Sequence, residues 1–194
     1  SIIMSLNISP ETKLGKLDSW DVEPFLKGVD RTYSIKDKNG KESAKLTTSE
    51  FKNFLETHNV SISSNGVLYT QDKRGLIPTL LEKWFDDRVQ FRKLAKKFAE
   101  QGDKEKYAYF DRRQYIQKVV LNSLYGVLGL PIFRFYDLDN AEATTTTGVE
   151  LIKYTKRMSN HFYNSVVEDK EDYCIYIDTD SVFYSAIPII QKKY

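Results

Sequence analysis

The stretch Tyr173–Ser185 constrains the fold most, because apolar residues flank an acidic centre. Aromatic and aliphatic residues precede Asp178, Thr179 and Asp180, and Val182–Tyr184 follow them. This pattern predicts two short β-strands joined by a tight turn. Two carboxylates two positions apart on one turn repel each other, and a divalent cation would offset that repulsion. An exposed acidic turn without a metal is the alternative, since Asp is common in turns.

A second pattern is helical and predicts the longest regular elements. From Pro78 to about Glu100, apolar residues recur at helical spacing, and after a break at 101–103 a second such run extends from about Lys106 to Gly126. Two helices of similar length with a short break between them predict an antiparallel helical hairpin. Its apolar stripes contain Leu80, Trp84, Phe91, Leu94 and Phe98 in the first helix, and Phe110, Ile116, Val119, Val120 and Leu124 in the second.

The rest of the chain carries weaker signals. Residues 11–45 predict irregular structure, apart from a weak strand at Thr32–Ile35 that leads into a turn at Asn39-Gly40. Thr47–Glu50 predicts the start of a helix, and Asn65-Gly66 predicts the turn of a second hairpin. A further helix is predicted from an N-cap at Asp139, with Glu142 three positions on, to about Asn164. Its face would carry Leu151, Tyr154, Met158 and Phe162.

Composition excludes several classes of protein. A hydrophobic content of 41% can fill a core, and no apolar run approaches the length of a membrane span. No secretory signal is visible at the start of the sequence. The single cysteine, Cys174, has no internal partner for a disulfide, which is typical of a reducing compartment. With two His and one Cys far apart, no zinc-site spacing exists.

Charge is concentrated on the predicted helical hairpin. Between Arg88 and Lys118 the sequence has ten basic and four acidic residues, a net charge of +6, against +2 for the whole chain. Such a stretch suits a polyphosphate or a nucleic-acid backbone. A solvated helix face is the alternative reading of a charge run.

The spacing of particular residues sharpens this expectation. Arg88 and Arg92 are four positions apart and share a helix face, as do Lys118, Asn122 and Tyr125 on the second helix. In an antiparallel hairpin both sets can face one groove, and three converging cations suit a triphosphate. The alternative is that the arginines pair with nearby carboxylates, namely Asp86, Asp87 or Glu82.

Two motifs together resemble a known family. The segment Lys118–Gly126, with the pattern Lys-x-x-x-Asn-Ser-x-Tyr-Gly, and the downstream Asp178-Thr-Asp-Ser181 resemble motifs B and C of family B DNA polymerases. Ser1-Ile2-Ile3 and Asn7–Thr12 resemble the sequence just after motif A of that family. The resemblance covers nearly the whole chain, thinly over 13–60. It is closest to replicative polymerases of tailed phages in the segments Ser1–Thr12, Gly66–Pro78 and Phe133–Gly148.

The resemblance implies an α+β fold. A long antiparallel helical hairpin, the fingers, would join part of an antiparallel-sheet palm domain that carries a β-hairpin with an Asp-Thr-Asp tip. The implied parts are a palm segment and connecting region at 1–77, the fingers at 78–128, and a palm segment with motif C at 129–194. The implied activity is template-directed transfer of a nucleotide from a dNTP to a primer 3′-hydroxyl, assisted by two Mg²⁺ ions.

The resemblance also implies roles for residues of the hairpin. Arg88, Arg92 and Lys118 would bind the phosphates of the incoming nucleotide, and Asn122 would lie near the triphosphate. Tyr125 and Gly126 would line the nascent base pair. Tyr125 would bind the incoming nucleotide there, and Gly126 would bind the DNA.

Further roles fall on the segment after the hairpin. Thr145 and Gly148 would lie near the backbone of the primer–template DNA. Asp180 would be the catalytic metal ligand, and Asp178 its supporting neighbour. Many members of the family have Gly where this chain has Ile177. The larger side chain would change the packing beneath the turn and leave the carboxylates unaltered.

The resemblance implies partners and a location as well. Primer–template DNA and dNTP are expected, a sliding clamp is a further candidate, and no membrane partner is expected. The expected location is the cytoplasm, in a phage-infected cell. The family's motif A aspartate would lie just before Ser1, so we expect these residues to need the motif A, exonuclease and thumb segments, in cis or as a separate chain, and to be inactive alone. The alternative is a non-catalytic nucleic-acid-binding or assembly piece of a split polymerase.

Overall fold

The computed structural model describes residues 2–193, with the backbone alone for Lys193. The chain forms two compact units, Ser1–Thr144 and Thr145–Tyr194. The boundary between them falls inside one long helix, α6 (Leu138–Val167). A search of the helices between residues 2 and 193 finds no candidate membrane span.

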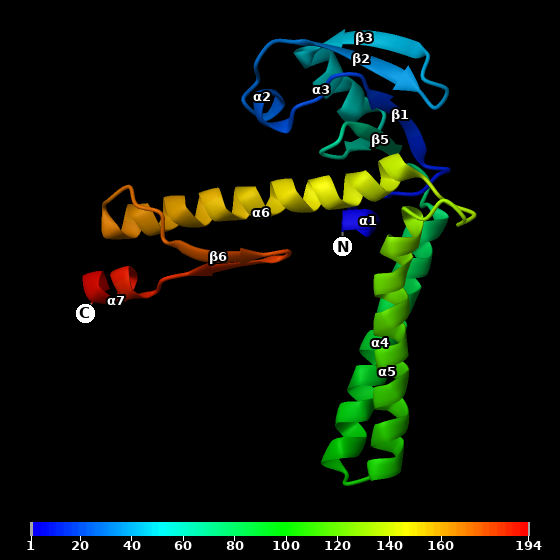
Figure 1. Cartoon of the computed structure of the whole chain (residues 1–194), viewed down its shortest axis with the longest axis vertical. Coiled ribbons are helices and arrows are strands. Elements are labelled where there is room, and N and C mark those ends of the chain that lie inside the picture. Colours follow the sequence, from blue (N-terminus) through cyan, green and yellow to red (C-terminus); the bar gives the residue numbers. More distant parts are fainter. Residues whose placement is uncertain (1, 194) are drawn as a thin grey trace. The chain divides into compact units, whose positions relative to one another are not determined.

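The first unit contains a five-stranded antiparallel sheet with the order β3-β2-β1-β5-β4. The short helices α2 and α3 accompany it, and α3 lies against the sheet (Figure 1). Between them they bury an aromatic and aliphatic cluster centred on Leu17, Tyr33, Ile35, Phe51 and Leu68. The elements are β1 (Lys13–Leu17), α2 (Val22–Leu26), β2 (Thr32–Asp37), β3 (Glu42–Thr47), α3 (Thr48–Thr57), β4 (Val60–Ile62) and β5 (Val67–Thr70).

Local signals in this part of the sequence are confirmed. The turn between β2 and β3 contains Gly40 with a φ of 78°, and the turn between β4 and β5 contains Gly66 with a φ of 83°, a region that favours glycine. Helix α3 begins with a capping box, in which the Thr47 side chain accepts from the Glu50 N–H and the Glu50 carboxylate accepts from the Thr47 N–H.

The expectation of irregular structure across residues 11–45 is wrong. This range contains β1, α2 and β3 in addition to the predicted strand at β2. Strand β1 has the sequence Lys-Leu-Gly-Lys-Leu, which lacks β-branched and aromatic residues and so gives no strand signal. It forms because β2 and β5 pair with it on both sides and because Lys13 and Lys16 find carboxylates elsewhere in the unit.

The helical hairpin is confirmed and is slightly longer than predicted. It consists of α4 (Leu76–Glu100) and α5 (Lys104–Leu128), each of 25 residues and each about 37 Å long. The two helices lie side by side and run in opposite directions (Figure 1). Phe110 of α5 stacks against both Phe91 and Phe98 of α4, with ring centroids 6.4 and 5.5 Å apart.

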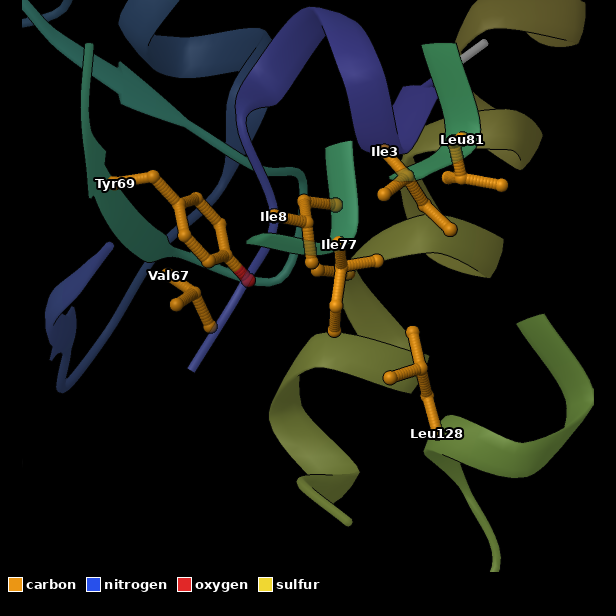
Figure 2. Packing of buried hydrophobic residues seen from close by; sticks show 8 residues of the cluster. Ile3, Ile8, Val67, Tyr69, Ile77, Leu81 and Leu128 are labelled. Atoms are coloured by element: carbon orange, nitrogen blue, oxygen red, sulfur yellow. The ribbon is translucent and has the colours of Figure 1, made fainter. Parts of the chain in front are cut away.

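The base of the hairpin is built into the main core of the first unit. Figure 2 shows the side chains of Ile77 and Leu81 at the start of α4 and of Leu128 at the end of α5, gathered with residues from α1 and β5. Helix α1 (Ile2–Leu6) contributes Ile3, and the segment after it contributes Ile8. The remaining buried members of this core are Val67, Tyr69 and Ala143.

The predicted N-cap of α6 is wrong by two residues. The carboxylate of Asp137 accepts a hydrogen bond from the Asn140 N–H at 3.2 Å, so Asp137 is the residue that caps the helix. Asp139 instead lies in the first turn and pairs with Lys13 at 2.8 Å and Lys16 at 2.7 Å. Burial acts to raise the pKa of Asp139, but hydrogen bonds from Lys13 and Lys16 outweigh it and leave this pKa below its ordinary value.

The second unit contains the rest of α6, a two-stranded antiparallel sheet and a terminal helix. The strands are β6 (Cys174–Asp178) and β7 (Ser181–Tyr184), and the helix is α7 (Ile187–Lys193). Tyr163 of α6 packs against Tyr173 and Tyr184, with centroids 5.5 and 5.3 Å apart. The predicted apolar face of α6, with Leu151, Tyr154, Met158 and Phe162, is exposed.

Candidate functional site

The two sets of hairpin residues lie at similar heights along the hairpin. Arg113 of α5 lies over the ring of Phe91 of α4, and Lys106 of α5 lies over the ring of Phe98 of α4. Residue numbers therefore rise along α4 as they fall along the neighbouring stretch of α5. Continuing this register toward the base puts Arg88 level with Ile116. Lys118 is then about 3 Å from the level of Arg88 along the axis.

The helical period also puts these residues on one side of the hairpin. Relative to Phe91, which faces α5, Arg88 and Arg92 lie about 60° and about 100° around α4 in the direction of the chain. Relative to Phe110, which faces α4, Lys118, Asn122 and Tyr125 lie about 80°, 120° and 60° around α5 in the same sense. Because the helices are antiparallel, equal senses of rotation lead to the same side of the pair.

Arg88 occupies an unusual environment. Its side chain is half-buried, and its Nε atom is buried without a hydrogen-bond partner. Within residues 2–193, neither Arg88 nor Arg92 forms an ion pair, and Lys118 forms none either. A buried guanidinium N–H without an acceptor is costly. The sequence allowed Arg88 to pair with Glu82. This pair does not form, because Glu82 pairs with Arg74.

The remaining hairpin candidates are open to solvent. Asn122, Tyr125 and Gly126 are all exposed on α5. A Cβ atom placed on Gly126 would meet nothing within 4 Å. The chain itself therefore gives no packing reason for glycine at this position of a helix.

The two candidate carboxylates lie in the second unit. Strand β6 ends at Asp178, which pairs with Ser181 of β7, and Thr179 and Asp180 form the turn between them. Asp178 and Asp180 are both exposed, and the Thr179 hydroxyl donates to the Asp178 carboxylate at 3.0 Å. The side chain of Ile177 is 39% exposed, so it does not fill a core beneath the turn.

These carboxylates fit one kind of metal site. In the described part of the chain, no group of three or more His, Cys, Asp or Glu side chains gathers in a way that could hold a metal ion. Two neighbouring exposed carboxylates do not form a closed cage. They fit Mg²⁺, which is usually bound by one or two carboxylates together with waters and substrate phosphates.

The candidates near the start of the second unit lie on α6. Thr145 is exposed and Gly148 is half-buried, one turn further along the same helix. Glycine and threonine are poor helix formers, yet the helix continues through them to Val167. By helical register the hairpin cations Arg88, Arg92 and Lys118 share one side of the hairpin in the first unit. In the second unit Asp178 and Asp180 lie at and beside one turn of the β6–β7 hairpin.

Sequence reasoning missed a set of polar residues at the base of the hairpin. Gly75 is the N-cap of α4 and offers no side chain, so the helix receives its cap from the segment after α1. Glu11 accepts a hydrogen bond from the Leu76 N–H, and the Ser9 hydroxyl accepts one from the Ile77 N–H at 3.4 Å. Asn7 accepts one from the Gly75 N–H at 2.9 Å. The signal was the run of Asn, Ser, Glu and Thr in Asn7–Thr12, a composition typical of capping residues.

The sequence is similar to those of known viral DNA polymerases. The sequence is 26% identical to the DNA-directed DNA polymerase of Escherichia phage RB69 and 27% identical to that of Enterobacteria phage T4, in each case over 99% of this chain. It is 35% identical to a DNA polymerase of Phaeocystis pouchetii virus over 57% of this chain. The chain spans 24% of the length of the two phage relatives and 11% of the third.

A solved structure is similar as well. The family B DNA polymerase from the hyperthermophilic archaeon Pyrobaculum calidifontis superposes with a TM-score of 0.54 and 25% sequence identity, over 96% of this chain and 19% of that one. The profile described as DNA polymerase family B matches residues 1–189. The α+β fold with its helical hairpin and antiparallel sheet, together with this match across almost the whole sequence, shows that the chain belongs to DNA polymerase family B.

Proposed function

We propose that this chain is the nucleotide-binding hairpin and part of the catalytic domain of a DNA-directed DNA polymerase. In this proposal the hairpin α4–α5 is the fingers, and the β6–β7 hairpin carries catalytic carboxylates. The substrates are a dNTP and primer–template DNA, and the remaining polymerase segments act with this one.

The environment of Arg88 is the observation that carries the proposal. Its buried Nε lacks an acceptor, and Arg92 and Lys118 on the same side of the hairpin form no ion pair among the described residues. A triphosphate would supply acceptors for all three cations at once. A solvated surface normally keeps each guanidinium N–H within reach of water, so the burial of this one is unusual for such a surface.

Other exposed hairpin residues would complete the nucleotide site. Asn122 and Tyr125 lie on the same side of α5 as Lys118, where an amide can hydrogen-bond to the triphosphate and a tyrosine ring can contact the base. At Gly126 the open space that a Cβ would enter allows the backbone to be approached closely by a nucleic acid. Thr145 and Gly148 would contact the primer–template backbone.

The chemistry would depend on Asp178 and Asp180. Divalent ions bound there, Mg²⁺ in this proposal, would activate the primer 3′-hydroxyl and stabilise the charge of the leaving pyrophosphate. Asp180 would be the ligand, because its carboxylate has no hydrogen-bond partner among the described residues. Asp178 would support it, since its carboxylate accepts from Thr179.

Steady-state kinetics of the complete polymerase tests the nucleotide site. Arg88→Ala and Lys118→Ala should each raise the KM for dNTP by about ten- to a hundred-fold, because each removes a charge-assisted hydrogen bond worth about 1.5–3 kcal/mol. The affinity for primer–template DNA should change little. Lys97→Ala is the matched control, because Lys97 is an exposed cation about 180° around α4 from Arg88.

These kinetics distinguish a nucleotide site from a nucleic-acid-binding surface. An unchanged dNTP dependence in Arg88→Ala and Lys118→Ala would rule out the nucleotide site. If instead both variants weakened DNA binding and left the KM for dNTP unaltered, the hairpin would be a nucleic-acid-binding surface of a non-catalytic piece.

A further inference from the structure

The helical hairpin is long and packs into the core of the first unit at its base. Helix α4 is buried against the core of the first unit at Ile77, Pro78 and Leu81, and farther out Phe91 and Phe98 contact α5. Arg88 lies twelve residues beyond Leu76, or about 18 Å along the helix. A tilt of about 5° at the base would therefore displace Arg88 by about 1.6 Å.

One side chain joins three segments at this base. Asn7 is fully buried and has a φ of 58°. Its Nδ2 group donates to the backbone carbonyls of Thr70 at 2.7 Å and Lys73 at 2.9 Å, and its Oδ1 atom accepts from the Gly75 N–H at 2.9 Å. Both donors and the acceptor of the amide are therefore used. No other amino acid could repeat this pattern and adopt a positive φ at so little cost.

The fit around the first residue of α4 is also close in space. A Cβ added at Gly75 would lie 2.7 Å from the Cβ of Ser9 and 3.1 Å from the Cγ2 of Thr12. The Thr12 hydroxyl in turn donates to the Asn7 carbonyl at 2.5 Å. Hydrogen bonds and packing thus fix the start of α4 against the Asn7–Thr12 segment, and neither leaves room for a shift.

The geometry points to Asn7 as a positioning residue for nucleotide binding. It does not touch the nucleotide in the proposed site, and the inference rests on the proposed function of Arg88. By holding the turn from Thr70 to Gly75, Asn7 sets the angle at which α4 leaves the core. That angle determines where Arg88 and Arg92 lie, and a displacement of about 1 Å in a binding group can cost about 100-fold.

Two variants of the complete polymerase disturb this base in different ways. Asn7→Gly keeps the positive φ and removes all three side-chain hydrogen bonds. Gly75→Ala keeps the hydrogen bonds of Asn7 and adds a methyl group that must displace Ser9 or the start of α4. Both should raise the KM for dNTP about tenfold, with a change in kcat of less than about threefold, because they misplace a binding group and leave the reacting atoms alone.

A matched control separates positioning from loss of stability. Thr47→Ala removes the N-cap of α3, which lies in the same unit and carries none of the proposed site. It should lower the melting temperature as Asn7→Gly does and leave the KM for dNTP unchanged. If Asn7→Gly fails to fold, Gly75→Ala decides the question on the same measurement.

Arg88→Ala, measured in parallel, distinguishes a failure of the positioning role of Asn7 from a failure of the proposed nucleotide site. A raised KM in Arg88→Ala, Asn7→Gly and Gly75→Ala, with an unchanged KM in Thr47→Ala, supports the positioning role. A raised KM in Arg88→Ala alone overturns the role of Asn7 and leaves the nucleotide site intact. An unchanged KM in Arg88→Ala overturns the nucleotide site, and the role of Asn7 fails with it.

Discussion

The carboxylate of Glu82 pairs with Arg74, which precedes α4, and not with Arg88, which lies further along the same helix. Arg74 also donates to the Met4 carbonyl at 2.7 Å, so this pair belongs to the base of the hairpin. Glu82 is one of three carboxylates that the sequence offered to Arg88, and the other two, Asp86 and Asp87, form no ion pair with it among the described residues. Arg88 is therefore left without an ion-pair partner among the described residues, and its Nε is buried without an acceptor.

The acidic turn gives the first prediction. In the complete polymerase, Asp180→Asn should reduce primer extension below detection and leave folding intact, because it removes a ligand charge and almost no volume. Asp178→Asn should be milder. Glu171→Gln, another exposed acid of the second unit, is the control and should leave extension unchanged. Primer-extension rates and circular dichroism check this, and a mild Asp180→Asn beside an inactive Asp178→Asn would reverse the two roles.

The second prediction concerns residues 1–194 produced as a separate polypeptide. Two-metal nucleotidyl transfer uses carboxylates on two sides of the ion pair, and the described residues offer the Asp178–Asp180 turn as one side. This polypeptide should therefore not extend a primer in Mg²⁺, and adding a polymerase segment that supplies the second carboxylate should restore extension if the pieces assemble. The assay is run with and without that segment, and robust extension by residues 1–194 alone would contradict the assignment.

Gly126 provides a prediction in which stability and function change in opposite directions. Gly126→Ala should stabilise the protein by about 1 kcal/mol, because alanine favours a helix interior and its methyl group meets open space. The same methyl group should weaken binding of primer–template DNA if the backbone of α5 approaches nucleic acid there. Denaturant unfolding and DNA-binding titrations measure the two effects. Unchanged DNA affinity would show that Gly126 has no such role.

A prediction on pH concerns the second unit. Hydrogen bonds from Lys156, Asn160 and the Cys174 N–H lower the pKa of Asp172 to about 2. Because this pKa is lower in the folded state than the ordinary value of 3.8, Asp172 stabilises the fold above about pH 4. That contribution should be lost as the pH falls toward 2.

The measurement for Asp172 is an NMR titration of its carboxyl group together with acid unfolding. Asp172→Asn should remove this part of the acid dependence, whereas Glu171→Gln, at the neighbouring exposed position, should not. A carboxyl group that titrates near its ordinary value would contradict the observed contact between Asp172 and Lys156, whose atoms lie 2.6 Å apart.

Much of this protein follows from its sequence alone, and those parts are local. The helices of the hairpin, the capping box at Thr47 and the glycine turns at Gly40 and Gly66 all depend on residues a few positions apart. Periodicity and turn chemistry report such short-range interactions directly. The candidate residues on the hairpin follow from the same spacing rule, combined with the resemblance of two motifs to a family.

Tertiary structure decided what depends on residues far apart in the chain. Strand β1 has no strand signal and exists because two neighbours pair with it and because Lys13 finds Asp137 and Asp139. Asp139 looked like a helix cap, but its charge is better satisfied by two lysines of β1, so Asp137 caps α6 instead. Asn7 binds the start of α4 because the fold brings these two segments together. In each case a buried or half-buried polar group pairs with a partner that offsets its desolvation cost, and only the folded chain determines which partners are within reach.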